Sequence, residues 1–183
     1  VGSNALRQYN SIGATIIGAS AGYQSYGQYT FLGGYAAGYS MSGNYNNAIG
    51  YNAGYSVSGT YNDILGYGAG YSISGTGNIA IGYQAADSLT SGSYNIVIGN
   101  NIDPVSNTGS AQLNIGNLIY GTALSSSTVV SLGNIGIGTT TPYAKLSVVG
   151  EIVGANFTAT STTATSTFAG GLNVGGGALT YDF

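Results

Sequence analysis

The chain has 183 residues, a length that suits a single domain of ordinary size. Only 4% of the residues are charged, against about 25% in a typical globular domain. Two basic residues cannot neutralise a phosphate backbone, which excludes nucleic-acid binding. Cysteine is absent, which excludes disulfides and thiolate sites, and we expect no membrane span because no apolar run approaches about 18 residues.

We interpret residues 1–11 as a cap or a connection to a preceding segment, and residues 12–101 as a head built from repeats. Three series of glycines recur in this head with a period of sixteen residues. They are Gly18, Gly34, Gly50, Gly66 and Gly82; Gly22, Gly38, Gly54 and Gly70; and Gly27, Gly43, Gly59 and Gly75. A fixed short period is typical of one structural unit stacked on copies of itself.

Each unit is predicted to contain two short strands separated by turns. The first strand centres on an aliphatic residue such as Ile49 or Leu65, and the second, at residues 55–58, alternates with period two. Glycine-rich breaks between the strands indicate turns with positive φ, and so many glycines exclude a helix. The pattern predicts an all-β fold, a parallel β-roll or β-solenoid whose coils stack about 4.8 Å apart.

Stacking places like side chains in ladders. An apolar ladder of Met41, Val57, Ile73 and Leu89 is predicted to lie inside the coil. A second ladder, which includes Ile49, is predicted to be buried, so that Ile49→Asp would unfold several coils together. Its strand is predicted to be covered on both faces, by the coil interior and by another chain. Its members are Ile17, Gly33, Ile49, Leu65, Ile81 and Ile98. Like charges at the same position in successive coils would repel each other, which explains why the chain has so few charged residues.

Tyrosine and asparagine form the remaining ladders. The tyrosine ladders are Tyr35, Tyr51, Tyr67 and Tyr83; Tyr23, Tyr39, Tyr55 and Tyr71; and Tyr29, Tyr45, Tyr61 and, after a gap at Gly77, Tyr94. The asparagine ladder, at a turn, is Asn46, Asn62, Asn78 and Asn95. Stacked aromatic rings and amides stabilise parallel strands in register. Because tyrosine has a flat apolar face and a polar tip, the ladders are also candidates for sugar or receptor binding.

The periodicity ends near Asn101. Residues 102–142 are expected to form an irregular connector, which contains both prolines and two short apolar segments at 113–121 and 133–139. Residues 143–183 are expected to form a thin β stalk that begins with a pair of strands at 144–153. Too few bulky apolar residues follow for a globular core.

Residues 47–56 (NAIGYNAGYS) are similar to the head repeats of trimeric autotransporter adhesins and of related bacteriophage tail fibres. Residues 112–121 and 133–148 resemble a tract common in long fibre proteins, many of which end in an intramolecular chaperone of the endosialidase tail-spike type. The resemblance covers about residues 12–150 and implies a parallel β-roll wound as a homotrimer. The autotransporter head unit is usually shorter than the sixteen residues found here.

No catalytic, cofactor or metal site is predicted. Histidine is absent, and Asp63, Asp87 and Asp103 lie one or more coils apart, so they form no local pair for acid–base catalysis. Asp103 with Asn100 and Asn101 offers oxygen ligands for calcium, but without the spaced loop of a calcium site. Residues 133–138 lack the Lys and the Ser or Thr of a phosphate-binding loop.

The sequence therefore predicts a structural and adhesive fibre without catalysis, an extracellular appendage of a cell or virion. We expect it to form a homotrimer, with end-to-end polymerisation and a glycan or protein receptor as further options. The alternative is a bacteriophage tail fibre that binds a host receptor or glycan. A polysaccharide-cleaving fibre would need paired carboxylates. Ice binding would need Thr-x-Thr on every coil, and that spacing occurs only at residues 158–162.

Overall fold

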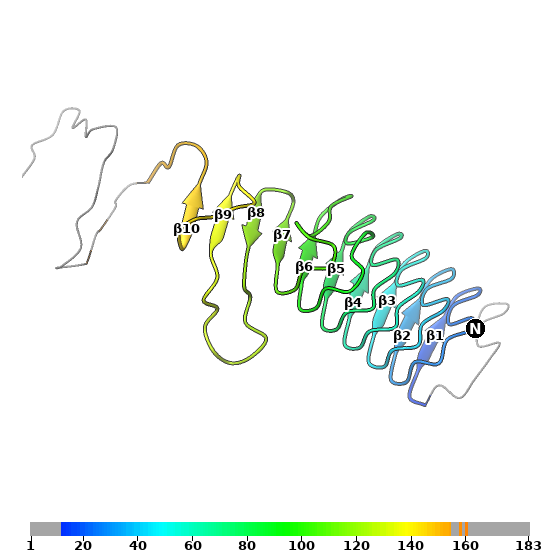
Figure 1. The fold of residues 1–183 in the computed structure, drawn as a ribbon. Coiled ribbons are helices and arrows are strands. Elements are labelled where there is room, and N and C mark those ends of the chain that lie inside the picture. The colour runs from blue at the N-terminus through cyan, green and yellow to red at the C-terminus, as the bar shows by residue number, and fades with distance from the viewer. Residues whose placement is uncertain (1–11, 155–157, 159, 161–183) are drawn as a thin grey trace, which may run out of the picture. The chain divides into compact units, whose positions relative to one another are not determined.

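The computed structural model describes residues 12–154, 158 and 160. The chain divides into a unit that ends at Glu151 and a second unit, Ile152–Phe183. The cap expected at residues 1–11 and most of the stalk expected at 143–183 lie outside the described residues. The described part of the first unit forms a single sheet of ten strands, which pair in chain order (Figure 1). No helix among the described residues is long and apolar enough to cross a membrane.

The strands are three residues long, and the first seven are parallel. They are β1 (Thr15–Ile17), β2 (Phe31–Gly33), β3 (Asn47–Ile49), β4 (Asp63–Leu65), β5 (Ile79–Ile81), β6 (Ile96–Ile98), β7 (Leu113–Ile115), β8 (Ile119–Gly121), β9 (Ile135–Ile137) and β10 (Leu146–Val148). Each strand from β1 to β7 pairs in register with the strand one coil away. The predicted all-β solenoid of stacked sixteen-residue coils is confirmed.

The solenoid continues further along the chain than the repeat pattern indicates. Strand β7 pairs with β6 in the parallel register of the earlier coils, and β8 is antiparallel to both β7 and β9. Residues 102–142, expected to be irregular, thus contain β7, β8 and β9. The last two coils are seventeen residues long, from Ile79 to Ile96 and from Ile96 to Leu113, which takes their residues out of the sixteen-residue phase.

Two strand predictions are wrong. In residues 144–153 only β10 forms, because Gly150 takes a φ of +131° that glycine readily adopts and the chain leaves the sheet. Each coil also has one strand where we predicted two. Residues 55 and 56 belong to a turn, and 57 and 58 form no strand. The segment still bonds the next coil, since the N–H groups of Ser56 and Ser58 donate to the carbonyls of Tyr71 and Ile73 at 2.8 and 2.9 Å.

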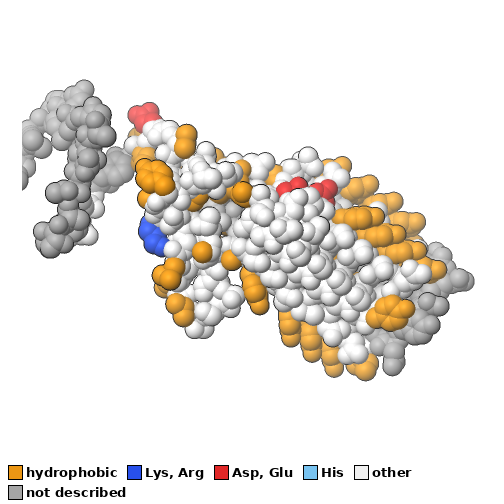
Figure 2. Space-filling model, viewed as in Figure 1, with side chains coloured by type: hydrophobic (Ala, Val, Ile, Leu, Met, Phe, Trp, Pro, Cys, Tyr) orange, Lys and Arg blue, Asp and Glu red, His pale blue; other side chains and the backbone are white. Residues whose placement is uncertain are grey.

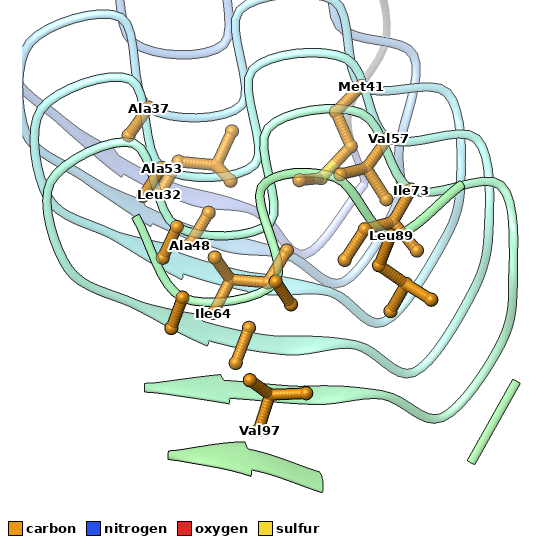
Figure 3. Close-up of a cluster of buried hydrophobic side chains, with 14 of the residues drawn as sticks. Leu32, Ala37, Met41, Ala48, Ala53, Val57, Ile64, Ile73, Leu89 and Val97 are labelled. Carbon is orange, nitrogen blue, oxygen red and sulfur yellow. The ribbon is translucent and has the colours of Figure 1, made fainter. Parts of the chain in front are cut away.

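Four ladders of buried side chains fill the coil interior. They are the strand centres Ile16, Leu32, Ala48, Ile64, Ala80 and Val97; the small residues Ala21, Ala37, Ala53, Ala69 and Ala85 with Ile102; the predicted ladder Met41, Val57, Ile73 and Leu89; and Asn46, Asn62, Asn78 and Asn95. Figure 3 shows Met41, Val57, Ile73 and Leu89 following one another on the side of the core away from the strand centres. The prediction that this ladder lies inside is confirmed.

The predicted orientation of the Ile49 ladder is wrong. Ile49 is 41% exposed, whereas its neighbour Ala48 is fully buried. Side chains alternate between the two faces of a strand, so the buried Asn46 fixes Ala48 inward and Ile49 outward. The aliphatic ladder therefore covers the outer face of the sheet and does not line the core.

The buried asparagines hydrogen-bond to one another from coil to coil. The Oδ1 atom of Asn46 accepts bonds from the backbone N–H of Asn62 at 2.8 Å and from its Nδ2 at 3.0 Å. Nδ2 of Asn62 also donates to the carbonyl of Gly75 at 3.1 Å. The same pattern joins Asn62 to Asn78, Asn78 to Asn95, and Asn95 to the side chain of Gln112. The ladder thus satisfies buried amides that would each cost about 1–3 kcal/mol without partners.

Close contact between coils explains the third glycine series. A Cβ atom on Gly59 would overlap the carbonyl oxygen of Gly75 in the next coil, and Gly43 and Gly75 meet the same obstacle. Gly33 differs, because a Cβ atom there would have Phe31 Cε1 as its nearest neighbour at 3.4 Å, an ordinary contact. The glycines of this series therefore allow the coils to approach to strand-pairing distance.

We predict that Thr30→Asn stabilises the protein. Thr30 occupies the asparagine position one coil before Asn46, and its buried Oγ1 has no hydrogen-bond partner in the described part of the chain. An asparagine would extend the ladder, and the added bonds should raise the free energy of unfolding by about 1–2 kcal/mol in urea denaturation. Asn62→Ala is the opposite control and should lower it. A Thr30→Asn protein no more stable than the parent would contradict the ladder's role.

We also predict that Gly59→Ala lowers the free energy of unfolding by about 1–3 kcal/mol, because the added methyl group forces two coils apart. The matched control, Gly33→Ala, should leave stability unchanged or raise it by about 0.4–1 kcal/mol through the restricted unfolded chain. Thermal unfolding followed by circular dichroism measures both. Equal effects of the two substitutions would show that coil contact does not set the requirement for glycine.

Candidate functional site

The outer face of strands β1–β7, here called the sheet face, carries two columns of side chains. One column is Thr15, Phe31, Asn47, Asp63, Ile79, Ile96 and Leu113, and the other is Ile17, Gly33, Ile49, Leu65, Ile81, Ile98 and Ile115. The second column has no polar side chain, and Ile49 and Leu65 are 41% and 47% exposed. Figure 2 shows hydrophobic side chains in evenly spaced rows along the solenoid. An exposed apolar patch of this extent is typical of an interaction surface.

The only charged residue of the sheet face is Asp63, in the first column. Its Oδ1 atom accepts a hydrogen bond of 2.7 Å from Nδ2 of Asn47, one coil away. This polar pair lies in one column only, so the second column is continuous in its apolar character from β1 to β7.

The predicted tyrosine ladders are present as stacked rings. Ring centroids lie 4.7 Å apart between Tyr39 and Tyr55, with an angle of 1° between the ring planes, and 5.3 Å apart between Tyr67 and Tyr83. Burial, together with Tyr39 and Tyr71 as neighbours, raises the pKa of Tyr55 above its ordinary value, so this phenol is neutral at physiological pH. The ladders therefore give the solenoid uncharged aromatic ridges with polar tips.

One tyrosine ladder has an unusual backbone. Tyr29, Tyr45, Tyr61 and Tyr94 all have φ between 54° and 59°, the left-handed region that non-glycine residues rarely adopt. At the gap in this ladder, a Cβ atom on Gly77 would lie only 2.8 Å from Cδ1 of Tyr94, so the ring of Tyr94 covers the backbone of Gly77. The ring of Tyr94 thus lies over the coil in which the ladder has no tyrosine.

A third surface consists of hydroxyl groups. Two rows of side chains flank the buried ladder of Met41: Ser40, Ser56, Ser72 and Ser88, and Ser42, Ser58, Ser74 and Thr90. Part of this surface is a shallow groove of about 390 Å³. The sequence analysis did not single out these residues, although a Ser-x-Ser pattern with the period of the coil marks them. The surface offers hydroxyl groups without charge.

The candidate calcium ligands from the sequence are Asp103, Asn100 and Asn101. Oδ1 of Asp103 accepts a hydrogen bond of 3.1 Å from the N–H of Ser88. Among the described residues, no group of three or more His, Cys, Asp and Glu side chains could hold a metal ion. Asp87, which replaces a ladder tyrosine, is partly buried, and this burial and the nearby Asp103 raise the pKa of its carboxyl.

Comparison of the chain with protein-family models, curated proteins and solved structures finds no match. The resemblance to autotransporter heads and tail fibres therefore stays a prediction. The function has to be argued from the surfaces described above.

We predict that Asp87→Asn stabilises the protein at neutral pH. A raised pKa means that the folded state binds the proton more tightly than the unfolded chain, whose Asp titrates near about pH 3.9. The contribution of Asp87 is therefore fully present below that pH and is lost as the pH rises through the folded-state pKa. Urea denaturation should show that the variant is more stable than the parent near about pH 7. The difference in the free energy of unfolding between the two proteins should disappear near about pH 3.

The matched control is Asp63→Asn, which removes the same charge from the exposed sheet face. If Asp63→Asn and Asp87→Asn change the pH dependence of stability equally, the effect reflects net charge and not the surroundings of Asp87.

Proposed function

We propose that this chain is a structural and adhesive segment of a homotrimeric fibre on the outside of a cell or virion, without catalytic activity. The observation that carries the proposal is the apolar column of the sheet face, from Ile17 to Ile115, whose members are exposed or partly exposed on the single chain. A fully buried Ile or Leu contributes about 1.5–3 kcal/mol relative to an exposed one, so covering this column stabilises the assembly substantially.

The repeat itself favours a second copy of the chain as the cover. Except at Gly33, the column presents one aliphatic side chain per coil at the strand spacing. Another copy of the same face has the same spacing and offers matching gaps over the whole length. Closed symmetry buries such faces around an axis, and three is the number of copies that the resemblance implies.

The remaining surfaces support an adhesive role. Tyrosine ridges and serine rows present phenols, hydroxyls and amides, and the chain has only seven charged residues, two basic and five acidic. A neutral surface of this kind binds a receptor through hydrogen bonds and aromatic contacts, which suits a surface glycan or a protein. We propose no reaction.

Light scattering and electron microscopy test the proposal. We expect the parent protein to have the mass of three 18.2 kDa chains and to form slender particles in micrographs. Ile49→Asp should reduce the mass to that of one chain and keep the strand signal in circular dichroism, because Ile49 lies outside the core. The matched control is Ser56→Asp on the hydroxyl surface, which should leave the mass unchanged.

A parent protein that is monomeric at all concentrations would overturn the trimer. A loss of strand signal in Ile49→Asp at the concentration where the parent is folded would place Ile49 in the core and contradict the outward orientation of the sheet face.

A further inference from the structure

A polar pocket of about 280 Å³ lies outside the sheet face, over the coils that contain β4 and β5. It is lined by Asn52, Tyr67, Gly68, Tyr71, Gln84 and Asp87. None of these residues belongs to the two columns of the sheet face. Trimerisation through the sheet face therefore does not require the pocket to be filled.

The pocket exists because one coil lacks a side chain. Ser20, Ala36, Asn52 and Gln84 share a ladder position with φ of 48–55°, and Gly68 occupies this position with φ of 61°. A Cβ atom at Gly68 would contact only Cγ of Gln84, at 3.5 Å. Space is thus left between the amide of Asn52 on one side and the amide of Gln84 on the other.

The aromatic wall of the pocket is the end of a tyrosine ladder. Tyr71 stacks on Tyr55 with centroids 4.9 Å apart, and the next coil has Asp87 at the equivalent position. One face of the Tyr71 ring is therefore not covered by another ring of this ladder. Accordingly Tyr71 is 42% exposed, whereas Tyr39 and Tyr55, with rings on both sides, are only partly exposed.

We propose that this pocket binds one pyranose ring of a neutral glycan. The apolar C–H face of the sugar packs on Tyr71, as an apolar group does on an aromatic ring. Asp87, Gln84 and Asn52 supply two amides and a carboxylate that accept and donate hydrogen bonds to the sugar hydroxyls. The proposal rests on the adhesive function above and names the chemistry of its receptor.

Size and charge select this ligand. The volume of about 280 Å³ lies just below the range of about 300–1,000 Å³ for pockets of drug-sized ligands, which favours a ligand as small as one sugar ring over a peptide. Asp87 lies close enough to Asp103 to feel its charge, and no basic residue lines the pocket. An anionic sugar would meet the carboxylate of Asp87 without a counter-charge, which favours an uncharged ring.

Saturation-transfer NMR on the full chain tests the proposal. The probes are the methyl pyranosides of glucose, galactose, mannose and N-acetylglucosamine. We expect saturation of the ring C–H protons of at least one probe. Tyr71→Ala should weaken binding about tenfold, as for the loss of one good aromatic contact. Tyr45→Ala, in another ladder, is the matched control and should bind like the parent.

Gly68→Asn is the second variant, and it fills the pocket. Its backbone conformation is already adopted by Asn52 at the same ladder position, so we expect the variant to fold and to keep the parent mass. It should lose the saturation signal. Absence of signal with all four probes, or a signal that survives Gly68→Asn, would overturn the sugar site.

The two proposals fail separately. A trimeric protein that binds none of the probes overturns only the sugar site. A monomeric parent protein overturns the homotrimer, and binding that is lost in Gly68→Asn would still support the pocket on the single chain.

Discussion

The structure depends on one constraint: each coil pairs with the next in register, at the distance of strand hydrogen bonding. Every side chain then meets its own copy one coil away. Amides and aromatic rings gain from this arrangement, as the Asn46–Asn62 bonds and the Tyr39–Tyr55 stack show. Charged side chains are destabilised by it, because like charges in successive coils repel, which explains why so few are present. Glycine is required where backbones meet, because a methyl group on Gly59 would overlap the carbonyl of Gly75.

The same constraint makes the exterior as regular as the core. A coil of sixteen residues has little interior, so alternate residues must point outward, and an aliphatic residue such as Ile49 is as readily outside as inside. Outside, it becomes one member of an apolar column that a single chain leaves exposed. Repetition therefore turns a local choice of residue into a long surface, which is the physical basis for proposing that the chain functions as an assembly.

The sequence predicts the coil, its period and its ladders, because period and register are the same property in a stacked fold. The sequence does not show which of Ala48 and Ile49 points into the core. Both residues are apolar, and the larger Ile49 is the more obvious core residue, although Ala48 is the buried one. The buried Asn46 indicates the orientation, because Ala48 lies two positions further along the chain and so on the same face, but we had assigned Asn46 to a turn. The coil of β7 was missed because a second seventeen-residue step, from Ile96 to Leu113, takes its residues further out of phase without changing the strand pairing.

The candidate binding pocket is less predictable for an instructive reason. Residues that obey the repeat are explained by stacking alone, so they carry little information about a ligand. Gly68 and Asp87 depart from their ladders, and the structure brings both departures to one pocket beside the free face of Tyr71. Residues that depart from an otherwise consistent pattern are candidates for function, because regular stacking does not explain them. In a fold built from copies, a specific site requires a coil that differs from its neighbours.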